Sequence, residues 1–186
     1  HVVVIMGSAG ETAEEAVSWL NENKGYKTGV VKVHLYRPFS AEHLLSAIPD
    51  SAKSISVLDR TREPGALGEP LYLDVCAALQ ASGDTRPVIN GIYGLSGRDI
   101  TPVMFQSVFD NMKQESPKRH FTVGINDDVL YTSLPKYEEI DMVPSTTKQC
   151  LFWGTGADGT VGANSEAINI ITMETELDAQ GYFLFE

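Results

Sequence analysis

Apolar and polar positions alternate in short blocks along the first part of the chain. Five of these blocks are rich in β-branched residues and have the length of buried strands. They read HVVVIM at 1–6, GVVKVHLYRPF at 29–39, SISVL at 54–58, PVINGIY at 87–93 and HFTVGI at 120–125. We expect the sheet core to contain Val4, Ile5, Val31, Val33, Ile55, Val57, Val88, Ile89 and Val123.

Between these blocks, apolar residues recur at helical spacing. Thr12 and Glu15 have the spacing of a capping box, and Ser40 stands where a second helix can begin. Pro70 and Pro102 each suit the first turn of a further helix. Because parallel strands need crossover connections, the pattern predicts an α/β fold with a mostly parallel five-stranded sheet and helices on both faces. The face predicted to be buried on the helix after Pro70 consists of Leu71, Leu73, Val75, Cys76 and Leu79.

The periodicity is lost after residue 125 and returns at residue 149. Residues 126–148 combine prolines and acids with little alternation, so we expect an extended connection between domains. Residues 149–186 predict a strand, a glycine-rich turn, a helix and a second strand at 181–185, which together make an incomplete βαβ unit. We therefore expect one α/β domain at 1–125 and the start of a second α/β domain at 149–186. The first block begins at residue 1 without a cap or leader, as expected of an internal segment.

The charge balance limits the classes of partner. The chain has 186 residues, with 25 acidic and 14 basic side chains and a net charge of −11. Nucleic-acid binding depends on clustered Lys and Arg, so we expect no nucleic-acid partner. No apolar run approaches the roughly 20 residues that span a bilayer, and no signal peptide precedes the first strand. We therefore expect a cytoplasmic protein without a membrane partner.

Few side chains are suited to metal or redox chemistry. The two cysteines, Cys76 and Cys150, lie far apart and form no C-x-x-C pair. By themselves they cannot supply a zinc or iron–sulfur site, and we interpret both as buried, reduced thiols. His34 has no second ligand at metal spacing, so we expect it to be structural.

The glycine-rich turn in QCLFWGTGADGTVGAN, residues 149–164, is the main local motif. Gly154, Gly156 and Gly159 fit the pattern G-x-G-x-x-G between a predicted strand and a predicted helix. Glycines let the backbone turn sharply and leave the N–H groups of the following helix free for an anion. The spacing leaves two interpretations open, a phosphate-binding turn and a tight β–α turn without a ligand. For a dinucleotide ligand, Glu176 or Asp178 is the candidate for the ribose.

A charged turn, DRTREPG at 59–65, follows the third predicted strand. The carboxyl ends of parallel strands form the edge where ligands and partners are usually met. Arg60 and Arg62 are therefore candidate interface residues, since a guanidinium presents a rigid fork of donors to carboxylates. The alternative is a solvated loop whose charges pair with one another. We interpret the earlier small-residue turn, GSAG at 7–10, as helix–strand packing rather than a ligand loop.

Four longer segments resemble a known family. They are YRPFS at 36–40, VLDRTREPGALGEPLYLDV at 57–75, HFTVGINDDV at 120–129 and LFWGTGADGTVGAN at 151–164. In this order they resemble pyruvate:ferredoxin oxidoreductase, and they extend over nearly the whole chain. The resemblance is to an internal segment of that large enzyme, namely the domain related to the C-terminal domain of transketolases and the opening of the domain after it.

The resemblance implies a part in a larger oxidoreductase. In that family the full polypeptide oxidatively decarboxylates pyruvate with thiamine diphosphate, and 4Fe–4S iron–sulfur clusters pass the electrons to ferredoxin or flavodoxin. Coenzyme A receives the acetyl group. The family holds thiamine diphosphate and the clusters with other domains, so the resemblance implies a non-catalytic, structural and interface segment. It also implies a homodimer in the cytoplasm, or in an anaerobic organelle such as a hydrogenosome.

The resemblance further associates the glycine turn with coenzyme A rather than with a nicotinamide. Thr155 and Ser165 stand where the family pattern has Leu and Lys, and the change at 165 removes a possible phosphate cation. A second hypothesis is that the same module serves as a docking domain in a protein without the oxidoreductase activity. The residues that match the pattern, and that we expect to form part of a coenzyme A site, are Gly154, Gly156, Asp158, Gly159, Thr160, Gly162 and Asn164.

Overall fold

The computed structural model of the chain describes residues 1–183. The chain divides into two compact units, residues 1–142 and residues 143–186, and each is described by itself. The strands are β1 (Val2–Met6), β2 (Gly29–Val33), β3 (Ile55–Asp59), β4 (Val88–Ile92) and β5 (His120–Thr122). The helices are α1 (Ala9–Lys24), α2 (Ala41–Ala47), α3 (Pro70–Ser82), α4 (Pro102–Lys113) and α5 (Thr160–Glu174), with a short 3-10 turn η1 (Leu95–Gly97).

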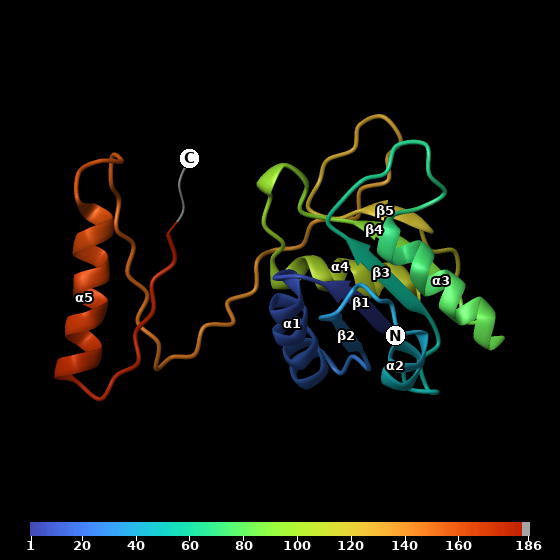
Figure 1. Cartoon of the computed structure of the whole chain (residues 1–186), viewed down its shortest axis with the longest axis horizontal. Helices are drawn as coiled ribbons and strands as arrows, with labels where there is room; N and C mark the ends of the chain where they lie inside the picture. Colours follow the sequence, from blue (N-terminus) through green and yellow to red (C-terminus); the bar gives the residue numbers. More distant parts are fainter. Residues whose placement is uncertain (184–186) are drawn as a thin grey trace. The chain divides into compact units, whose positions relative to one another are not determined.

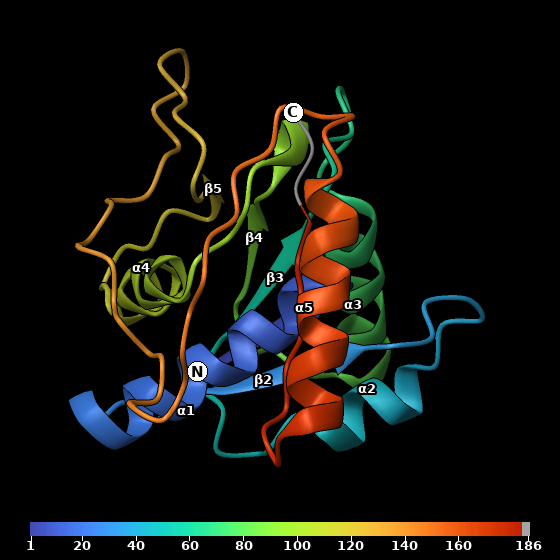
Figure 2. The same cartoon turned by 90° about the vertical axis from the view of Figure 1, so that its left-hand side faces the viewer.

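The first unit is built on one sheet of five parallel strands in the order β2-β1-β3-β4-β5 (Figure 1). Helices α1 and α4 cover one face of the sheet, and α2 and α3 cover the other (Figures 1 and 2). The predicted α/β class, the parallel pairing and the helices on both faces are thus confirmed. The chain order reverses direction between β1 and β3, which makes their carboxyl ends the topological switch point of the sheet.

Two apolar clusters, one on each face of the sheet, form the core. Successive residues of β1 alternate between them, with Val3 and Ile5 facing α1 and α4 while Val2 and Val4 face α2 and α3. Among the residues expected in the sheet core, Val31, Val33 and Val88 are half-buried, the first two because β2 is an edge strand. The others are buried as predicted, namely Val4, Ile5, Ile55, Val57, Ile89 and Val123.

Two strands are shorter than the sequence pattern predicts. β2 ends at Val33, which pairs with Met6, the last residue of β1. Beyond this pair the edge strand has no neighbour, and Leu35 is 69% exposed although its spacing continues the strand. β5 ends at Thr122, which pairs with Ile92 at the end of β4. Each strand therefore ends where its neighbour in the sheet ends.

The observed helix starts show which of the predicted capping residues and prolines begin a helix. Ser40 caps α2, because its hydroxyl accepts a hydrogen bond from the His43 backbone N–H at 3.3 Å. Pro70 and Pro102 occupy the first turns of α3 and α4 as predicted. The capping box at Thr12 is wrong, since α1 begins at Ala9. The chain turns at Gly7, with φ of 82°, directly after β1, and α1 begins at once with its small buried residues against the sheet.

The first unit continues past residue 125. The Asp127 carboxylate accepts backbone hydrogen bonds from Val129 and Leu130 and folds the chain into a tight loop. Leu134 then packs into the core on the α4 side, where it is 7% exposed, and Ser107 on α4 donates to the Pro135 carbonyl at 2.7 Å. The first part of the expected connection at 126–148 is therefore folded onto β5 and α4, because it carries an apolar anchor that sequence periodicity does not detect.

Asp59, the last residue of β3, joins the sheet to α3. Its side chain is completely buried, and its two carboxylate oxygens accept from the backbone N–H groups of Leu71 and Tyr72, each at 3.1 Å. These amides lie in the first turn of α3, where a helix lacks internal acceptors. Burial raises the pKa of the Asp59 carboxyl, and the negative charge of Glu69 raises it further. The two backbone hydrogen bonds lower the pKa and so oppose both effects. The carboxylate thus holds the end of β3 against the start of α3, the two points between which the loop 60–69 runs.

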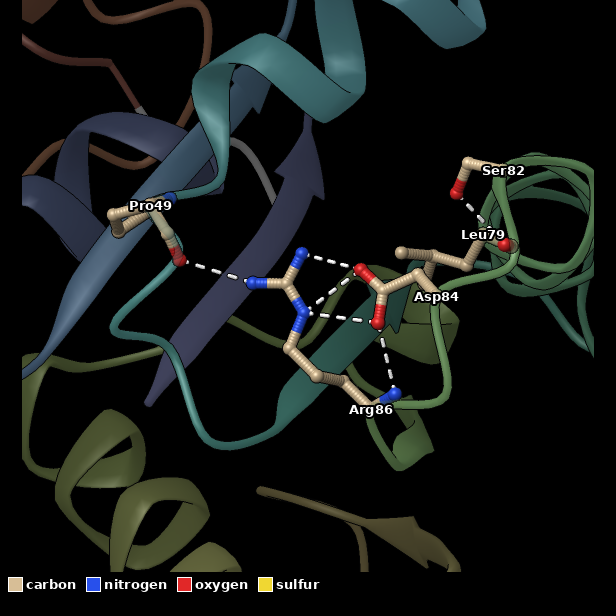
Figure 3. A network of polar contacts seen from close by, with 5 residues as sticks. All are labelled: Pro49, Leu79, Ser82, Asp84 and Arg86. Atoms are coloured by element: carbon tan, nitrogen blue, oxygen red, sulfur yellow. Dashed lines mark hydrogen bonds and ion pairs between the residues drawn. The ribbon is translucent and has the colours of Figure 1, made fainter.

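A second polar network holds the opposite edge of the sheet (Figure 3). Arg86, just before β4, pairs with Asp84 and donates to the carbonyl of Pro49, in the loop before β3, at 2.9 Å. The guanidinium thereby links the loops that precede two neighbouring strands. Hydrogen bonds from Arg86 lower the pKa of the Asp84 carboxyl from its usual value near 3.8.

The second unit contains α5 and extended chain. No strand is present among residues 149–154, and Leu151, Phe152 and Trp153 are all exposed. The predicted strand there is wrong, because residues 143–183 supply no neighbour with which it could pair. The second predicted strand is absent from residues 181–183, and its remaining residues, 184 and 185, lie outside the described part of the chain.

The two cysteines also differ from expectation. Cys76 on α3 is half-buried, whereas Cys150 is exposed, so the prediction of two buried thiols is wrong for Cys150. Cys150 belongs to the run that does not pair as a strand, which explains its exposure. None of the helices in the described part of the chain combines the length and apolar character that crossing a membrane requires.

We expect Asp59→Ala to lower the free energy of unfolding by about 2–3 kcal/mol, because two buried N–H groups lose their acceptor. Asp59→Asn keeps one acceptor oxygen and should cost roughly half as much. Urea unfolding monitored by far-UV circular dichroism measures both. Asp128→Ala, at an exposed aspartate, is the matched control and should change little. Equal stability of Asp59→Ala and the control would show that the carboxylate does not hold α3.

We expect the Asp84–Arg86 pair to contribute stability that depends on pH. The folded pKa of Asp84 is lowered, so the contribution is present above the unfolded pKa and is lost as the pH falls through the lower, folded pKa. The stability difference between the wild type and Arg86→Gln should therefore be largest above about pH 4 and shrink below it. Urea midpoints between about pH 6 and pH 2.5 measure this difference. Lys53→Gln, at an exposed cation nearby, should show no such change.

Candidate functional site

The glycine turn leads into α5 through two backbone positions that require glycine. Gly156 has φ of 101° and Gly159, the N-cap residue of α5, has φ of 83°. A side chain is strained at these angles. Gly154 is required for a different reason, since a Cβ there would lie 2.8 Å from the Thr160 side chain. The shape of the turn thus accounts for the three glycines of the G-x-G-x-x-G pattern.

Asp158 organises the turn from within. Its carboxylate accepts hydrogen bonds from the backbone N–H of Thr155 at 2.8 Å and of Thr160 at 3.0 Å. These two N–H groups, with that of Thr155 contributing most, lower the pKa of the Asp158 carboxyl well below its usual range. The aspartate therefore remains charged and occupies part of the amino-terminal end of α5. The tight-turn interpretation explains Asp158 without a ligand.

Gly162 is not explained by the turn. It lies in the first turn of α5 with helical geometry, and a Cβ built on it would meet no atom within 4 Å. Glycine in a helix costs about 1 kcal/mol relative to alanine, so packing within the chain gives no reason for it. A ligand that approaches the helix backbone closely would give one. Asn164, one residue before Ser165, is half-buried.

The turn has no cation of its own. No Lys, Arg or His occurs in the sequence from residue 149 onward. Ser165, where the family pattern has Lys, donates its hydroxyl to the Val161 carbonyl at 3.0 Å. Any anion at this turn must be held by backbone N–H groups at the start of α5.

The dinucleotide interpretation requires a second parallel strand after the helix, and the described residues after α5 contain none. In that motif the acid that binds the ribose follows a second parallel strand. Glu176 and Asp178 instead follow the end of α5 at Glu174, and residues 175–183 contain no strand. The described part of the turn is thus a helix amino terminus without the supporting sheet.

The carboxyl edge of the first unit holds a cavity of about 160 Å³ at the switch point. Arg60 lines it and donates from Nε to the Gly94 carbonyl at 3.1 Å, while its side chain remains exposed. Tyr93, Arg98 and Asp99 line the same cavity from the chain after β4. The sequence indicated Arg60 but missed the other three, which only the strand order brings to this edge.

Arg62 lines a different cavity, of about 200 Å³, formed by the loop 62–69 and the ends of β4 and β5. The two arginines predicted as a pair are thus separated into two hollows. Glu69 and Asn90 are buried at the second cavity and were missed by the sequence analysis. The available signal was a polar Asn in the middle of the apolar run at 87–93.

Other reactive groups are few. Burial raises the pKa of the Cys76 thiol, which keeps it protonated and poorly nucleophilic. Within residues 1–183, no three His, Cys, Asp or Glu side chains gather as metal ligands would.

Comparison with known proteins gives consistent matches along the chain. The family described as pyruvate:ferredoxin oxidoreductase core domain II matches residues 1–105. The pyruvate:ferredoxin oxidoreductase of Moorella thermoacetica is 52% identical over 186 residues, and the pyruvate-flavodoxin oxidoreductase of Enterobacter agglomerans is 54% identical over 188. Each alignment covers 100% of this chain and 16% of the relative. The pyruvate dehydrogenase (NADP+) of Cryptosporidium parvum is 45% identical, with 10% of its length covered.

The chain thus spans about a sixth of the length of the first two relatives. The match to core domain II covers strands β1 to β4, helices α1 to α3 and the start of α4. On the strength of the domain match and of alignments that cover the whole chain at about half identity, this chain belongs to the pyruvate:ferredoxin oxidoreductase family.

Proposed function

We propose that this chain acts as a non-catalytic structural and interface segment of a long pyruvate oxidoreductase. One observation carries the proposal. The whole chain aligns with such enzymes, but it covers only about one sixth of their length. In this proposal other domains hold thiamine diphosphate and the iron–sulfur clusters, and the whole enzyme, a homodimer, passes electrons to ferredoxin or flavodoxin.

We further propose that the glycine turn contributes the backbone part of a coenzyme A site. Gly162 supports this, because it leaves the first turn of α5 open where the chain itself does not require glycine. Coenzyme A carries phosphates, which suit the free N–H groups of a helix amino terminus. Asp158 and Thr160 hold the turn in shape, and Asn164 lies one turn further along the helix.

Arg60 and Arg62 are proposed as contacts to neighbouring domains. Both are exposed, and no ion pair within the described residues involves either of them. Arg60 is fixed by its bond to Gly94, whereas Arg62 lies on the loop 62–69. We propose one α/β domain at 1–125 and the start of a second at 149–186, joined by the segment 126–148, the first part of which is folded onto β5 and α4.

We expect the purified chain to show no pyruvate-dependent dye reduction. It contains no cysteine motif for an iron–sulfur cluster, and the cofactors in this proposal belong to other domains. The assay is anaerobic reduction of methyl viologen with pyruvate and coenzyme A, compared with that of the whole enzyme. Activity that persists after removal of contaminating enzyme would contradict the proposal. If the native protein that carries this chain has neither iron nor thiamine diphosphate, it is a docking module instead.

We expect Gly162→Ala to have opposite effects on the helix and on the ligand. It should stabilise α5 by up to about 1 kcal/mol because alanine favours helix. In the whole enzyme it should weaken the binding of coenzyme A at least about threefold, because the added methyl group stands where the ligand approaches the backbone. The Michaelis constant for coenzyme A measures the second effect.

Asn169→Ala is the matched control for this variant. It lies at an exposed position in the middle of α5 and also favours helix, but it is remote from the turn. It should leave the Michaelis constant for coenzyme A unchanged. If Gly162→Ala behaves in the same way as this control, the turn is not part of the coenzyme A site.

A further inference from the structure

The cavity under the loop 62–69 contains a buried acid without a cation. Glu69, the N-cap residue of α3, is 5% exposed, and its carboxylate accepts a hydrogen bond from the Asn90 side-chain amide. None of the ion pairs within residues 1–183 involves Glu69. The amino terminus of α3 offsets part of its charge. Buried carboxylates in proteins are nevertheless normally paired with a cation.

Asn90, which donates to Glu69, supplies a second sign of a missing partner. It is 3% exposed in the middle of β4, and its carbonyl oxygen Oδ1 is buried without a hydrogen bond. Its Nδ2 group faces the Glu69 carboxylate and lies 3.3 Å from His120 Nδ1. Turning the amide over would place its oxygen against the carboxylate, so Glu69 fixes the orientation. The free oxygen therefore requires a donor that the described chain does not provide.

Both residues line the same cavity. Its volume is about 200 Å³, and the walls come from the loop 62–69, from the ends of β4 and β5 and from residues 130 and 132. This is smaller than the roughly 300–1,000 Å³ of pockets that hold cofactors and drug-sized ligands. It is enough for one side chain or for a small cation. Thr122 and Thr132 also line it, but each hydroxyl already donates within the chain, to Ile125 and Asp127 respectively.

From these observations we infer that the cavity binds a guanidinium or ammonium group, which donates to the Glu69 carboxylate and to Asn90 Oδ1. A guanidinium suits the pair best, because its planar fork presents several N–H donors side by side. A bound cation also relieves the repulsion between Glu69 and the buried Asp59 carboxylate, whose pKa is raised by burial and by the charge of Glu69. The site is separate from the coenzyme A proposal, because it lies wholly within the first unit.

The same group can come from a small molecule or from an arginine of another protein segment. Titration with methylguanidinium, followed by NMR on the whole chain, tests the shared chemistry. We expect saturable, millimolar binding that shifts the Asn90 side-chain NH₂ signals and the backbone signals of the loop. Methylurea has the same shape without the charge, and it should bind at least about tenfold more weakly. This comparison uses the wild type alone, so it does not depend on how any variant folds.

Two variants locate the binding. Glu69→Gln keeps the shape of the side chain without its charge. It should weaken the binding of methylguanidinium at least about tenfold. Glu63→Gln removes an exposed acid that lines the same cavity, and it should bind as the wild type does. Equal binding of methylguanidinium and methylurea would overturn the inference. So would unchanged binding in Glu69→Gln.

Two further arms identify the source of the cation. N-acetyl-arginine methylamide carries the guanidinium on a peptide backbone, and binding of this probe assigns the cavity to a protein side chain. Binding of methylguanidinium alone assigns it to a small molecule. Arg62→Gln tests whether the chain fills its own cavity. If the wild type binds neither probe and Arg62→Gln binds both, Arg62 is the internal counterion and the inference is overturned.

Discussion

The structure depends most on a single carboxylate at the end of a central strand. Asp59 is completely buried, and it accepts the first N–H groups of α3 from the end of β3. It thereby fixes both ends of the loop 60–69 within a short distance of each other. The loop carries Arg60, which reaches the cavity at the switch point, and Glu69, which lines the other cavity. A change in this one anchor would displace both sites at the carboxyl edge.

The two units use apolar side chains in opposite ways. The first unit buries phenylalanines and β-branched residues on both faces of its sheet, as an independent α/β layer must. In the second unit, α5 has no buried residue among those described, and Trp153 is 86% exposed. A single helix without packing is only marginally stable in water.

The candidate sites also differ in their electrostatics. The turn before α5 has backbone N–H groups and no cation, so it suits an anion only weakly by itself. The cavity beside Glu69 has uncompensated acceptors and suits a cation. Neither offers an activated nucleophile or a metal-ligand group within the described residues. The two candidate sites thus differ in the sign of the ligand charge that each of them suits.

The sequence by itself determined the α/β class, the five strands of the first unit along the chain and the positions of Pro70 and Pro102 in their helices. These features follow from local periodicity and local steric preferences, which depend only on residues that are close together in the sequence. The resemblance to the family also came from the sequence, because the four matching segments are long enough to be specific. The strand ends could not be read in this way, since β2 and β5 stop where β1 and β4 stop.

Only the tertiary structure decided which polar residues meet. Asn90 and Glu69 lie 21 positions apart, and they come together because β4 lies beside β3, whose end carries the loop to α3. Leu134 joins the core across a stretch without periodicity, and the apolar run at Leu151 stays exposed because no strand pairs with it. Burial and pairing depend on contacts between distant segments, and a sequence pattern records the tendency of a residue to be buried but not the neighbour that buries it.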